Sequence, residues 1–290
     1  LYQMKYVIIT PVKDEESFIK EVLHSVINQT IKPEEWVIID DNSSDNTYQI
    51  ISEYAIKHLW IKLYKNSDPE QKERSGGSKI VNLFNIGIQK VQTTDYEIIT
   101  KLDADLALPK DYFSTIINNF KNKPDVALCG GYCLIPDGNG GWVREYNNPD
   151  HVRGAFKAYR KNAFTKIGGL LSIWNWDGVD EMMLMQKDYK IETLELPVKH
   201  FRPTSDAYNP YKHSYKSGQE IYRMRYGFLI MIGKSLSLMK EKPYIIKGFY
   251  LISGYFASLI NRDSSILDPD LSKFIRHYYY NKILNYLINK

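Results

Sequence analysis

Short apolar runs alternate with stretches of helical periodicity over the first two thirds of the chain. The runs at residues 5–10, 36–39, 61–64 and 96–100 are rich in β-branched and aromatic side chains. Continuous runs of this length are typical of strands that are buried on both faces. We therefore predict four strands, the first of which is buried and stops at Pro11.

Between these runs, apolar residues recur every three to four positions, as they do on one face of an amphipathic helix. This spacing predicts helices over residues 18–27, 47–54, 78–91 and 111–121. Asp14 is the expected cap of the first helix, with Glu15 and Glu16 in its first turn, and Pro33 ends it.

Alternating strands and helices predict an α/β domain, a Rossmann-like, mostly parallel sheet with helices on both faces. In such sheets, ligands bind outside the carboxyl ends of the strands. Pro11, the pair Asp40 and Asp41, and the pair Asp103 and Asp105 all follow predicted strands. We therefore expect these three clusters to meet in one crevice.

After residue 207 the pattern changes, and we expect one large α/β domain over 1–207 followed by a helical region over 208–290. Residues 227–232 and 244–260 are apolar and aromatic, but Gly233, Lys234, Lys247 and Gly254 interrupt them. Neither stretch offers about twenty continuous apolar residues, so a membrane-spanning helix is not expected. Membrane-interface contact is one explanation for these stretches, and helical packing or homodimer burial is the other.

Composition limits the partners and the cellular compartment that we expect for the protein. The net charge of +4 over 290 residues is too small to argue for a nucleic-acid partner, although it allows contact with an anionic membrane. Cys129 and Cys133 lie in one predicted strand, roughly 13 Å apart, which is too far for a disulfide. No signal peptide is visible. We expect a cytoplasmic protein, with peripheral contact at the inner face of the cell membrane as a further hypothesis.

Asp103 and Asp105 are the strongest chemical signal in the chain. An Asp-x-Asp directly after a buried strand delivers hard oxygen ligands to a sheet edge, where Mg²⁺ or Mn²⁺ could bind and neutralise a diphosphate. The alternative is a solvated turn that caps the next helix. The pair Asp40 and Asp41 has a similar alternative, capping of the helix that follows.

Several motifs in order resemble the family 2 glycosyltransferases. They are residues 8–16, Gln29 with Pro33, residues 36–47, the Asp103–Asp105 motif, residues 153–156 with 164–170, and finally residues 176–181 and 200–204. The last two resemble a membrane-associated bacterial branch. The resemblance covers roughly residues 5 to 205. It implies a GT-A fold and inverting transfer from a nucleoside-diphosphate sugar, with UDP as the usual nucleotide of the family and GDP and dTDP open.

The same resemblance implies roles for the residues that bind the donor. Pro11, Lys13 and Glu15 would line the nucleotide pocket, and Asp41 would accept a hydrogen bond from the base.

It also implies a metal and diphosphate site. Asp103 would lie near both the ribose and the metal, and Asp105 would ligate the metal, with His200 as an additional ligand. Arg74 or Lys79 would reach the diphosphate.

Inverting transfer needs a base that removes the proton of the attacking acceptor hydroxyl. The family places it in a Glu-Asp pair that opens a helix, but the pair here is reversed, Asp180 and Glu181. Asp180 is our first candidate, followed by Glu181 and then Asp177. The alternative is that these acids only interact with the helix dipole.

Four other side chains have a structural and a functional interpretation. Arg202 could pair with phosphate or lie at the surface. Tyr132, Trp174 and Trp176 could stack on an acceptor sugar or pack in the core.

The leading hypothesis is a metal-dependent transferase that acts on a glycan or lipid-diphosphate-linked acceptor in bacterial surface polysaccharide assembly. A sugar-1-phosphate nucleotidyltransferase is one alternative, but it would need a glycine-rich loop where residues 11–15 contain no glycine. A catalytically inert nucleotide-sugar-binding or scaffold protein is the other alternative.

Overall fold

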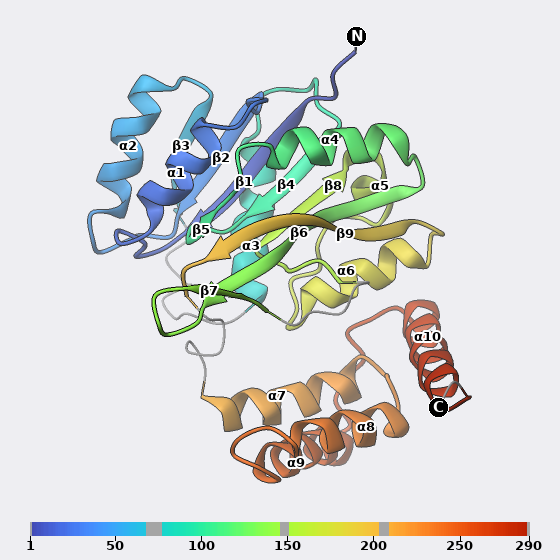
Figure 1. Cartoon of the computed structure of the whole chain (residues 1–290). Helices are drawn as coiled ribbons and strands as arrows, with labels where there is room; N and C mark the ends of the chain where they lie inside the picture. The colour runs from blue at the N-terminus through green and yellow to red at the C-terminus, as the bar shows by residue number, and fades with distance from the viewer. Residues whose placement is uncertain (1, 68–76, 146–150, 203–208, 289–290) are drawn as a thin grey trace. The chain divides into compact units, whose positions relative to one another are not determined.

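The computed structural model describes residues 2–67, 77–145, 151–202 and 209–288 (Figure 1). The chain divides into two compact units, Leu1–Pro203 (unit 1) and Thr204–Lys290 (unit 2). The boundary predicted at residue 207 falls outside the described residues.

Unit 1 is built on one mixed sheet whose strand order is β3-β2-β1-β4-β8-β6-β9-β5, with β7 paired to β6. The strands β3, β2, β1 and β4 run parallel, whereas β8 is antiparallel to both of its neighbours. The strands are β1 Tyr6–Val12, β2 Glu35–Asp40, β3 Ile61–Lys65, β4 Ile98–Leu102, β5 Leu106–Ala107, β6 Val126–Pro136, β7 Trp142–Arg144, β8 Phe156–Arg160 and β9 Lys190–His200.

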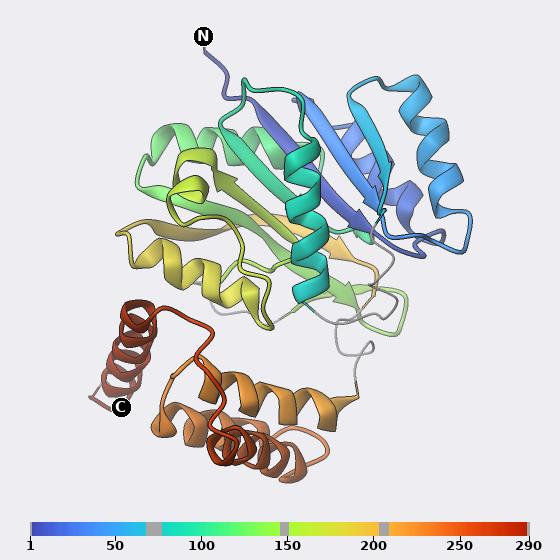
Figure 2. The same ribbon diagram turned by 180° about the vertical axis from the view of Figure 1, so that it is seen from behind.

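Helices cover both faces of this sheet, as Figure 1 and the reverse view in Figure 2 show. One apolar core joins α1, α2 and α4 to one face, and a second core joins α3, α5 and α6 to the other. Ile8 points into the first core, and its neighbours Val7 and Ile9 point into the second, as expected for a strand buried on both sides. The helices are α1 Ile19–Ile27, α2 Thr47–Lys57, α3 Ser78–Lys90, α4 Tyr112–Asn122, α5 Lys161–Lys166 and α6 Trp176–Met185.

Two predicted boundaries near the first strand are wrong. The strand β1 continues through Pro11 to Val12, and Pro11 lies opposite Ile39 of β2. The first helix starts at Ile19, because Asp14 has a φ of 52° and its carboxylate accepts hydrogen bonds from Ser44 in the next loop. Asp14 therefore joins two loops and caps no helix.

The strand register brings the predicted polar clusters to one edge of the sheet. The strand β1 lies between β2 and β4, all three parallel, so their carboxyl ends point the same way. Asp41 directly follows β2 and Asp103 directly follows β4.

Unit 2 consists of helices in its described residues: α7 Pro210–Arg223, α8 Phe228–Leu238, α9 Ile246–Ile260 and α10 Pro269–Ile288. The helices α7 and α9 touch through their backbones, since a Cβ atom added to Gly254 would lie 1.9 Å from the carbonyl oxygen of Tyr215. Among the described residues, no helix combines the length and the apolar character needed to cross a membrane.

Candidate active site

Hydrogen bonds join the loops that follow β1 and β2. The Ser44 amide donates to Asp14 Oδ1 at 2.7 Å, and the Glu15 amide donates to Thr47 Oγ1 at 2.7 Å. Asn46 Nδ2 donates to Glu16 at 2.7 Å. Hydrogen bonds among acidic and hydroxyl-bearing residues therefore connect the two loops at the sheet edge.

Asp41 lies at the centre of this edge and is buried. Its carboxylate pairs with Lys79 Nζ at 2.6 Å, accepts a bond from Asn66 Nδ2 at 2.9 Å, and lies 3.5 Å from Lys13 Nζ. The structure thus brings together three residues that the sequence assigned to the donor site. Asn66 was not predicted, and nothing in the sequence around it distinguishes it from an ordinary loop asparagine.

Asp40 precedes this group and is fully buried. Its Oδ2 accepts from the Ser43 amide at 3.3 Å, and its Oδ1 has no hydrogen-bond partner among the described residues. Pro11 is buried within β1, and Arg74 lies outside the described residues.

The two carboxylates of the Asp-x-Asp motif have different partners. Asp103 pairs with Lys101, whose ammonium also donates to the Gly154 carbonyl at 2.8 Å. Lys101 is almost fully buried in β4, although the Asp103 side chain is 27% exposed. Asp103 therefore faces the accessible side of the edge.

Asp105 lies beside His200 because β5 pairs with β9 in a register that sets Leu106 opposite His200. His200 Nε2 lies 3.3 Å from Asp105 Oδ2. Arg202 Nε contacts the same oxygen at 3.2 Å, and its Nη2 pairs with Glu15. The pairing of β5 with β9 thus brings together residues that are almost a hundred positions apart in the sequence.

These contacts set the protonation of the pair. Burial opposes ionisation of Asp105, but the hydrogen bond and charge of His200 and the charge of Arg202 outweigh it and lower the pKa of Asp105. Burial likewise acts against a charged His200, yet its bonds to Asp105 and Cys133 raise the pKa of His200 to about 10. The two groups thus form an ion pair at neutral pH.

No group of three or more His, Cys, Asp or Glu side chains in the described part of the chain is arranged to hold a metal ion. Mg²⁺ and chemically similar ions bind through one or two carboxylates together with substrate phosphates, and need no all-protein cage. Asp105, with Asp103 and His200 nearby, fits that kind of site, whereas a closed structural metal centre does not fit.

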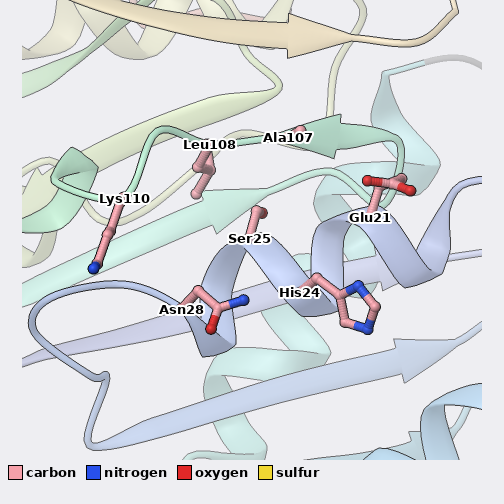
Figure 3. Close-up of a pocket in the computed structure, with 7 residues that line it drawn as sticks. All are labelled: Glu21, His24, Ser25, Asn28, Ala107, Leu108 and Lys110. Carbon is pink, nitrogen blue, oxygen red and sulfur yellow. The ribbon is translucent and has the colours of Figure 1, made fainter.

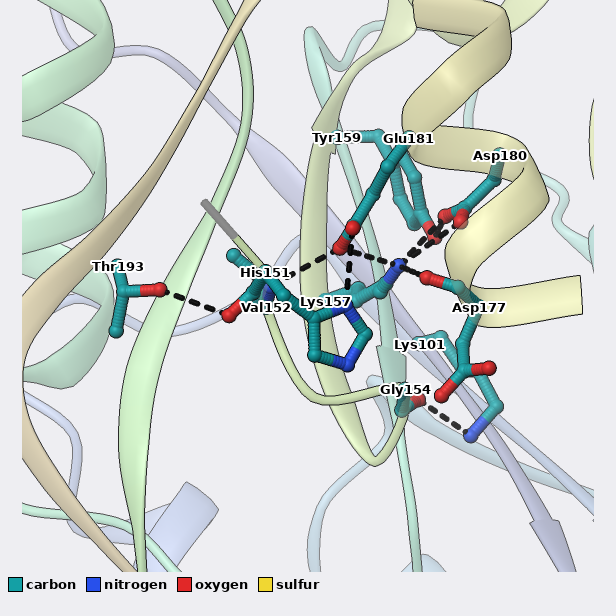
Figure 4. Close-up of polar contacts among 10 residues, drawn as sticks. All are labelled: Lys101, His151, Val152, Gly154, Lys157, Tyr159, Asp177, Asp180, Glu181 and Thr193. Carbon is teal, nitrogen blue, oxygen red and sulfur yellow. Dashed lines mark hydrogen bonds and ion pairs between the residues drawn. The ribbon is translucent and has the colours of Figure 1, made fainter. Parts of the chain in front are cut away.

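Asp180 and Glu181 lie in α6 and converge on Lys157 of β8, as Figure 4 shows. Lys157 Nζ lies 2.9 Å from both oxygens of Asp180 and 3.0 Å from Glu181 Oε1. The Tyr159 hydroxyl donates to Asp180 at 2.5 Å. All of these side chains are buried, with exposures of 0 to 2%.

Glu181 has two further partners, the Val152 amide at 2.9 Å and His151 Nδ1 at 2.9 Å. Burial opposes its charge, but Lys157 and His151 outweigh that effect and lower the pKa of Glu181. For Asp180, burial prevails over Lys157 and raises the pKa to about 6. The sequence signal for this network is Lys157 itself, a lysine between the apolar residues Phe156 and Ala158 of β8, and our sequence reasoning missed it.

Asp177 is placed differently from these two acids. It lies in the first turn of α6 and is partly exposed, and its carboxylate points toward Lys101 and Gly154 (Figure 4). A Cβ atom added to Gly154 would lie 3.1 Å from Asp177 Oδ2, so the missing side chain gives Asp177 its space. Lys157 Nζ also donates to the Asp177 carbonyl at 2.5 Å.

The predicted aromatic side chains are mostly packed against cations. Trp176 is buried, with Lys101 Nζ 5.2 Å and Lys157 Nζ 5.6 Å from its ring centroid. The Arg144 guanidinium covers the Tyr132 ring at 3.9 Å. Trp176 therefore belongs to the core of unit 1, whereas Trp174 is partly exposed.

A separate hollow of about 260 Å³ lies between α1 and the segment after β5 (Figure 3). Its lining includes Glu21, His24 and Lys110. It contains none of the predicted donor, metal or base residues, so we do not assign it to the active site.

Comparisons with known proteins agree with this arrangement. A family model described as glycosyl transferase family 2 matches residues 7–189. A poly-beta-1,6-N-acetyl-D-glucosamine synthase of Staphylococcus epidermidis is 30% identical over 205 residues, which cover 64% of this chain and 45% of that protein. The chain thus spans about half the length of the curated relatives that it matches.

Solved structures show the fold. TarS 1-349 of S. aureus in complex with UDP aligns with a TM-score of 0.53 at 15% identity, covering 89% of this chain and 72% of that one. The mannosyltransferase PcManGT from Pyrobaculum calidifontis, in complex with GDP-Man and Mn²⁺, aligns with a TM-score of 0.57 at 17% identity, covering 90% and 89%. These neighbours confirm the predicted GT-A fold. Because the family model matches more than half of the residues of this chain, the chain belongs to glycosyl transferase family 2 and is a glycosyltransferase.

Proposed function

We propose that this glycosyltransferase moves a sugar, with inversion, from a nucleoside-diphosphate sugar to a hydroxyl of a glycan or lipid-linked acceptor. A UDP-sugar is the proposed donor, and bacterial surface polysaccharide assembly is the proposed setting. The observation that carries the proposal is the alignment of Asp41, Asp103 and Asp105 along one sheet edge, each in contact with a cationic side chain. The UDP and GDP-Man complexes of the structural neighbours support a nucleotide-sugar donor.

Donor binding is assigned to the Asp41 side of the edge. We assign the base contact to Asp41 because it directly follows β2 at this edge, where Lys13 and Lys79 hold its carboxylate in place. Lys13 is partly exposed, so it can also meet an incoming phosphate.

A divalent cation is part of the proposal, with Asp105 as its main protein ligand and Asp103 and His200 beside it. When bound, Mg²⁺ or Mn²⁺ would stabilise the charge of the departing diphosphate. His200 would have to release its proton first, because a protonated imidazole offers no lone pair at Nε2.

We propose Asp177 as the base that accepts the proton of the acceptor hydroxyl. Asp180 stood first in the sequence ranking, but its oxygens are buried and bound by Lys157 and Tyr159, which leaves no room for a hydroxyl. Asp177 is partly exposed and lies on the side of Lys101 and Gly154. Lys157 is then a positioning residue, since it fixes the backbone of Asp177 by its bond to that carbonyl.

The test is an assay of nucleoside diphosphate release with a panel of UDP, GDP and dTDP sugars in the presence of Mn²⁺. We expect slow hydrolysis of one donor, lost on addition of a chelator and in Asp105→Asn. Release of pyrophosphate from a nucleoside triphosphate and a sugar 1-phosphate, with no nucleoside diphosphate released from any nucleotide sugar, would point to a nucleotidyltransferase. Failure of every nucleotide sugar to react or to raise the melting temperature would contradict the proposal.

A further inference from the structure

Large apolar side chains cover the solvent side of unit 2. In α9, the residues Ile246, Phe249, Tyr250, Phe256 and Ile260 are exposed, and they recur at the three-to-four-residue spacing of one helix face. Phe249 is 62% exposed and Ile260 77%. A helix of a water-soluble domain normally turns such a face inward.

The opposite face of α9 explains why the apolar face of this helix is not turned inward here. Gly248, Gly254 and Ser258 are among the buried residues of α9, and Cβ atoms added to Gly218 of α7 or Gly254 of α9 would each lie 1.9 Å from a backbone oxygen of the other helix. Backbone contact at two glycines fixes the rotation of α9 about its axis. Phe249 and the other exposed side chains are therefore held outward, whereas Leu251 and Tyr255 are buried on the side of the glycines.

The apolar surface continues onto α8. Phe228 of α8 lies 6.4 Å, centroid to centroid, from both Tyr255 and Phe256 of α9. Leu229 and Leu236 extend the exposed surface along α8. We call the exposed apolar side chains of α8 and α9 the α8–α9 face; they are Phe228, Leu229, Leu236, Ile246, Phe249, Tyr250, Phe256, Leu259 and Ile260.

The charges around this face are almost all positive. Residues 228–262 contain Lys234, Lys240, Lys242, Lys247 and Arg262, but only one acid, Glu241. Over residues 204–290 there are 13 lysines and arginines against 6 aspartates and glutamates, whereas residues 1–203 have 25 against 28. The basic character of the protein is therefore confined to unit 2.

The effect of these charges reaches a neighbouring side chain. Burial, and then the charges of Lys234 and Lys247, lower the pKa of His213 in α7. Lys234 of α8 and Lys247 of α9 thus both lie near His213 of α7.

We propose that the α8–α9 face docks on the surface of an anionic lipid bilayer. Exposed aromatic and aliphatic side chains would enter the boundary between headgroups and acyl chains, and the surrounding lysines would meet the lipid phosphates. A second copy of the chain fits less well, because a symmetric contact would bring two positively charged surfaces together. This inference concerns a surface of unit 2 and does not depend on the reaction proposed above.

The experiment is flotation of the full chain with vesicles of phosphatidylcholine alone or with about one third phosphatidylglycerol. We expect binding to the anionic vesicles at low salt, at least several-fold weaker binding to the neutral ones, and a decrease as ionic strength rises. The variant Phe249→Ser/Phe256→Ser should bind about tenfold or more weakly, because each ring contributes to burial in the lipid.

The matched control is Ile56→Ser/Leu59→Ser, which removes two side chains of unit 1 with exposures of 77% and 79%. It should bind vesicles as the parent does, and circular dichroism should show that both variants are folded at the temperature of the assay. Two results would overturn the proposal. One is equal binding by the parent and the Phe249/Phe256 variant. The other is no vesicle binding together with a dimer in light scattering that the same variant dissociates, which would assign the face to a second copy.

Discussion

At the scale of single residues, the feature with the largest energetic consequence is the buried group formed by Lys157, Asp180 and Glu181. A buried ion pair contributes little net stability over an apolar replacement, but removal of one partner leaves an uncompensated charge. Lys157 faces two carboxylates, so its loss would leave both of them without their cation.

We predict that Lys157→Met destabilises the protein by about 3–5 kcal/mol. Urea unfolding monitored by tryptophan fluorescence measures this change. The double variant Lys157→Met/Asp180→Asn should recover part of the loss, because it removes one of the stranded charges. A single variant as stable as the parent would contradict the buried network.

The base assignment gives a second prediction. Asp177→Asn should reduce turnover by roughly 10²–10⁴-fold while donor affinity, measured by calorimetry, stays the same. Asp180→Asn should mainly lower the melting temperature, since that carboxylate serves the network. If Asp180→Asn abolishes turnover in a protein of parental stability and Asp177→Asn does not, Asp180 is the base, as the sequence predicts.

His200 gives a pH dependence. Its pKa is about 10 in the folded protein against 6.5 in the unfolded chain, so its pairing stabilises the fold fully below about pH 6.5. That stabilisation is lost as the pH rises through about 10. Melting temperatures in the presence of chelator should therefore fall more steeply between pH 6.5 and 9.5 in the parent than in His200→Asn. Parallel curves would show that the pair with Asp105 is not formed.

Sequence reasoning predicted the acidic residues of the candidate site but not the partners that orient them. Asp41, Asp103 and Asp105 could be found because each follows an apolar run that ends at a sheet edge. Lys101 and Lys157 could not be found by the same rule, because each lies within a strand and its role depends on which strands become neighbours. The burial of Asp180 likewise depends on the docking of α6 on β8, which no local pattern contains.

At the scale of secondary structure, the helix pair α7 and α9 depends on glycine. Gly254→Val would place side-chain atoms where the Tyr215 carbonyl lies, and we expect a loss of about 1–3 kcal/mol or more. Gly233 is the matched control, because it lies within α8 with open space around it. Gly233→Ala should stabilise the protein by roughly 0.5–1 kcal/mol. Thermal unfolding of both variants makes the comparison, and equal effects would exclude close packing at Gly254.

The elements of unit 1 were largely predictable, since long apolar periods such as the one in α3 depend on the local sequence. The start of α1 was not. Asp14 has the chemistry of a cap, but Ser44, thirty positions away, takes its carboxylate. A tertiary hydrogen bond thus overrides a local preference, which is the usual reason for misplaced helix ends.

At the scale of the whole molecule, each unit buries an apolar core of its own. We therefore predict that calorimetry resolves two unfolding transitions. All described residues of the proposed donor site belong to unit 1. UDP with Mn²⁺ should therefore raise the unfolding free energy of one transition only, by about 2.7 kcal/mol at a hundredfold excess over Kd. A single transition that moves as a whole on ligand addition would show that the units unfold together.

The glycine contact between α7 and α9 also has a practical side. Backbone contact at the glycines, together with buried Leu251 and Tyr255, holds these helices in place, whereas Phe249 on the opposite face of α9 is 62% exposed and contributes little to the core. Protein engineers can therefore replace Phe249 and Ile260, which are 62% and 77% exposed, by polar residues with little effect on folding, as an aid to crystallisation. Natural substitutions on the same face could likewise change the membrane contact proposed above, while unit 1 stays unchanged.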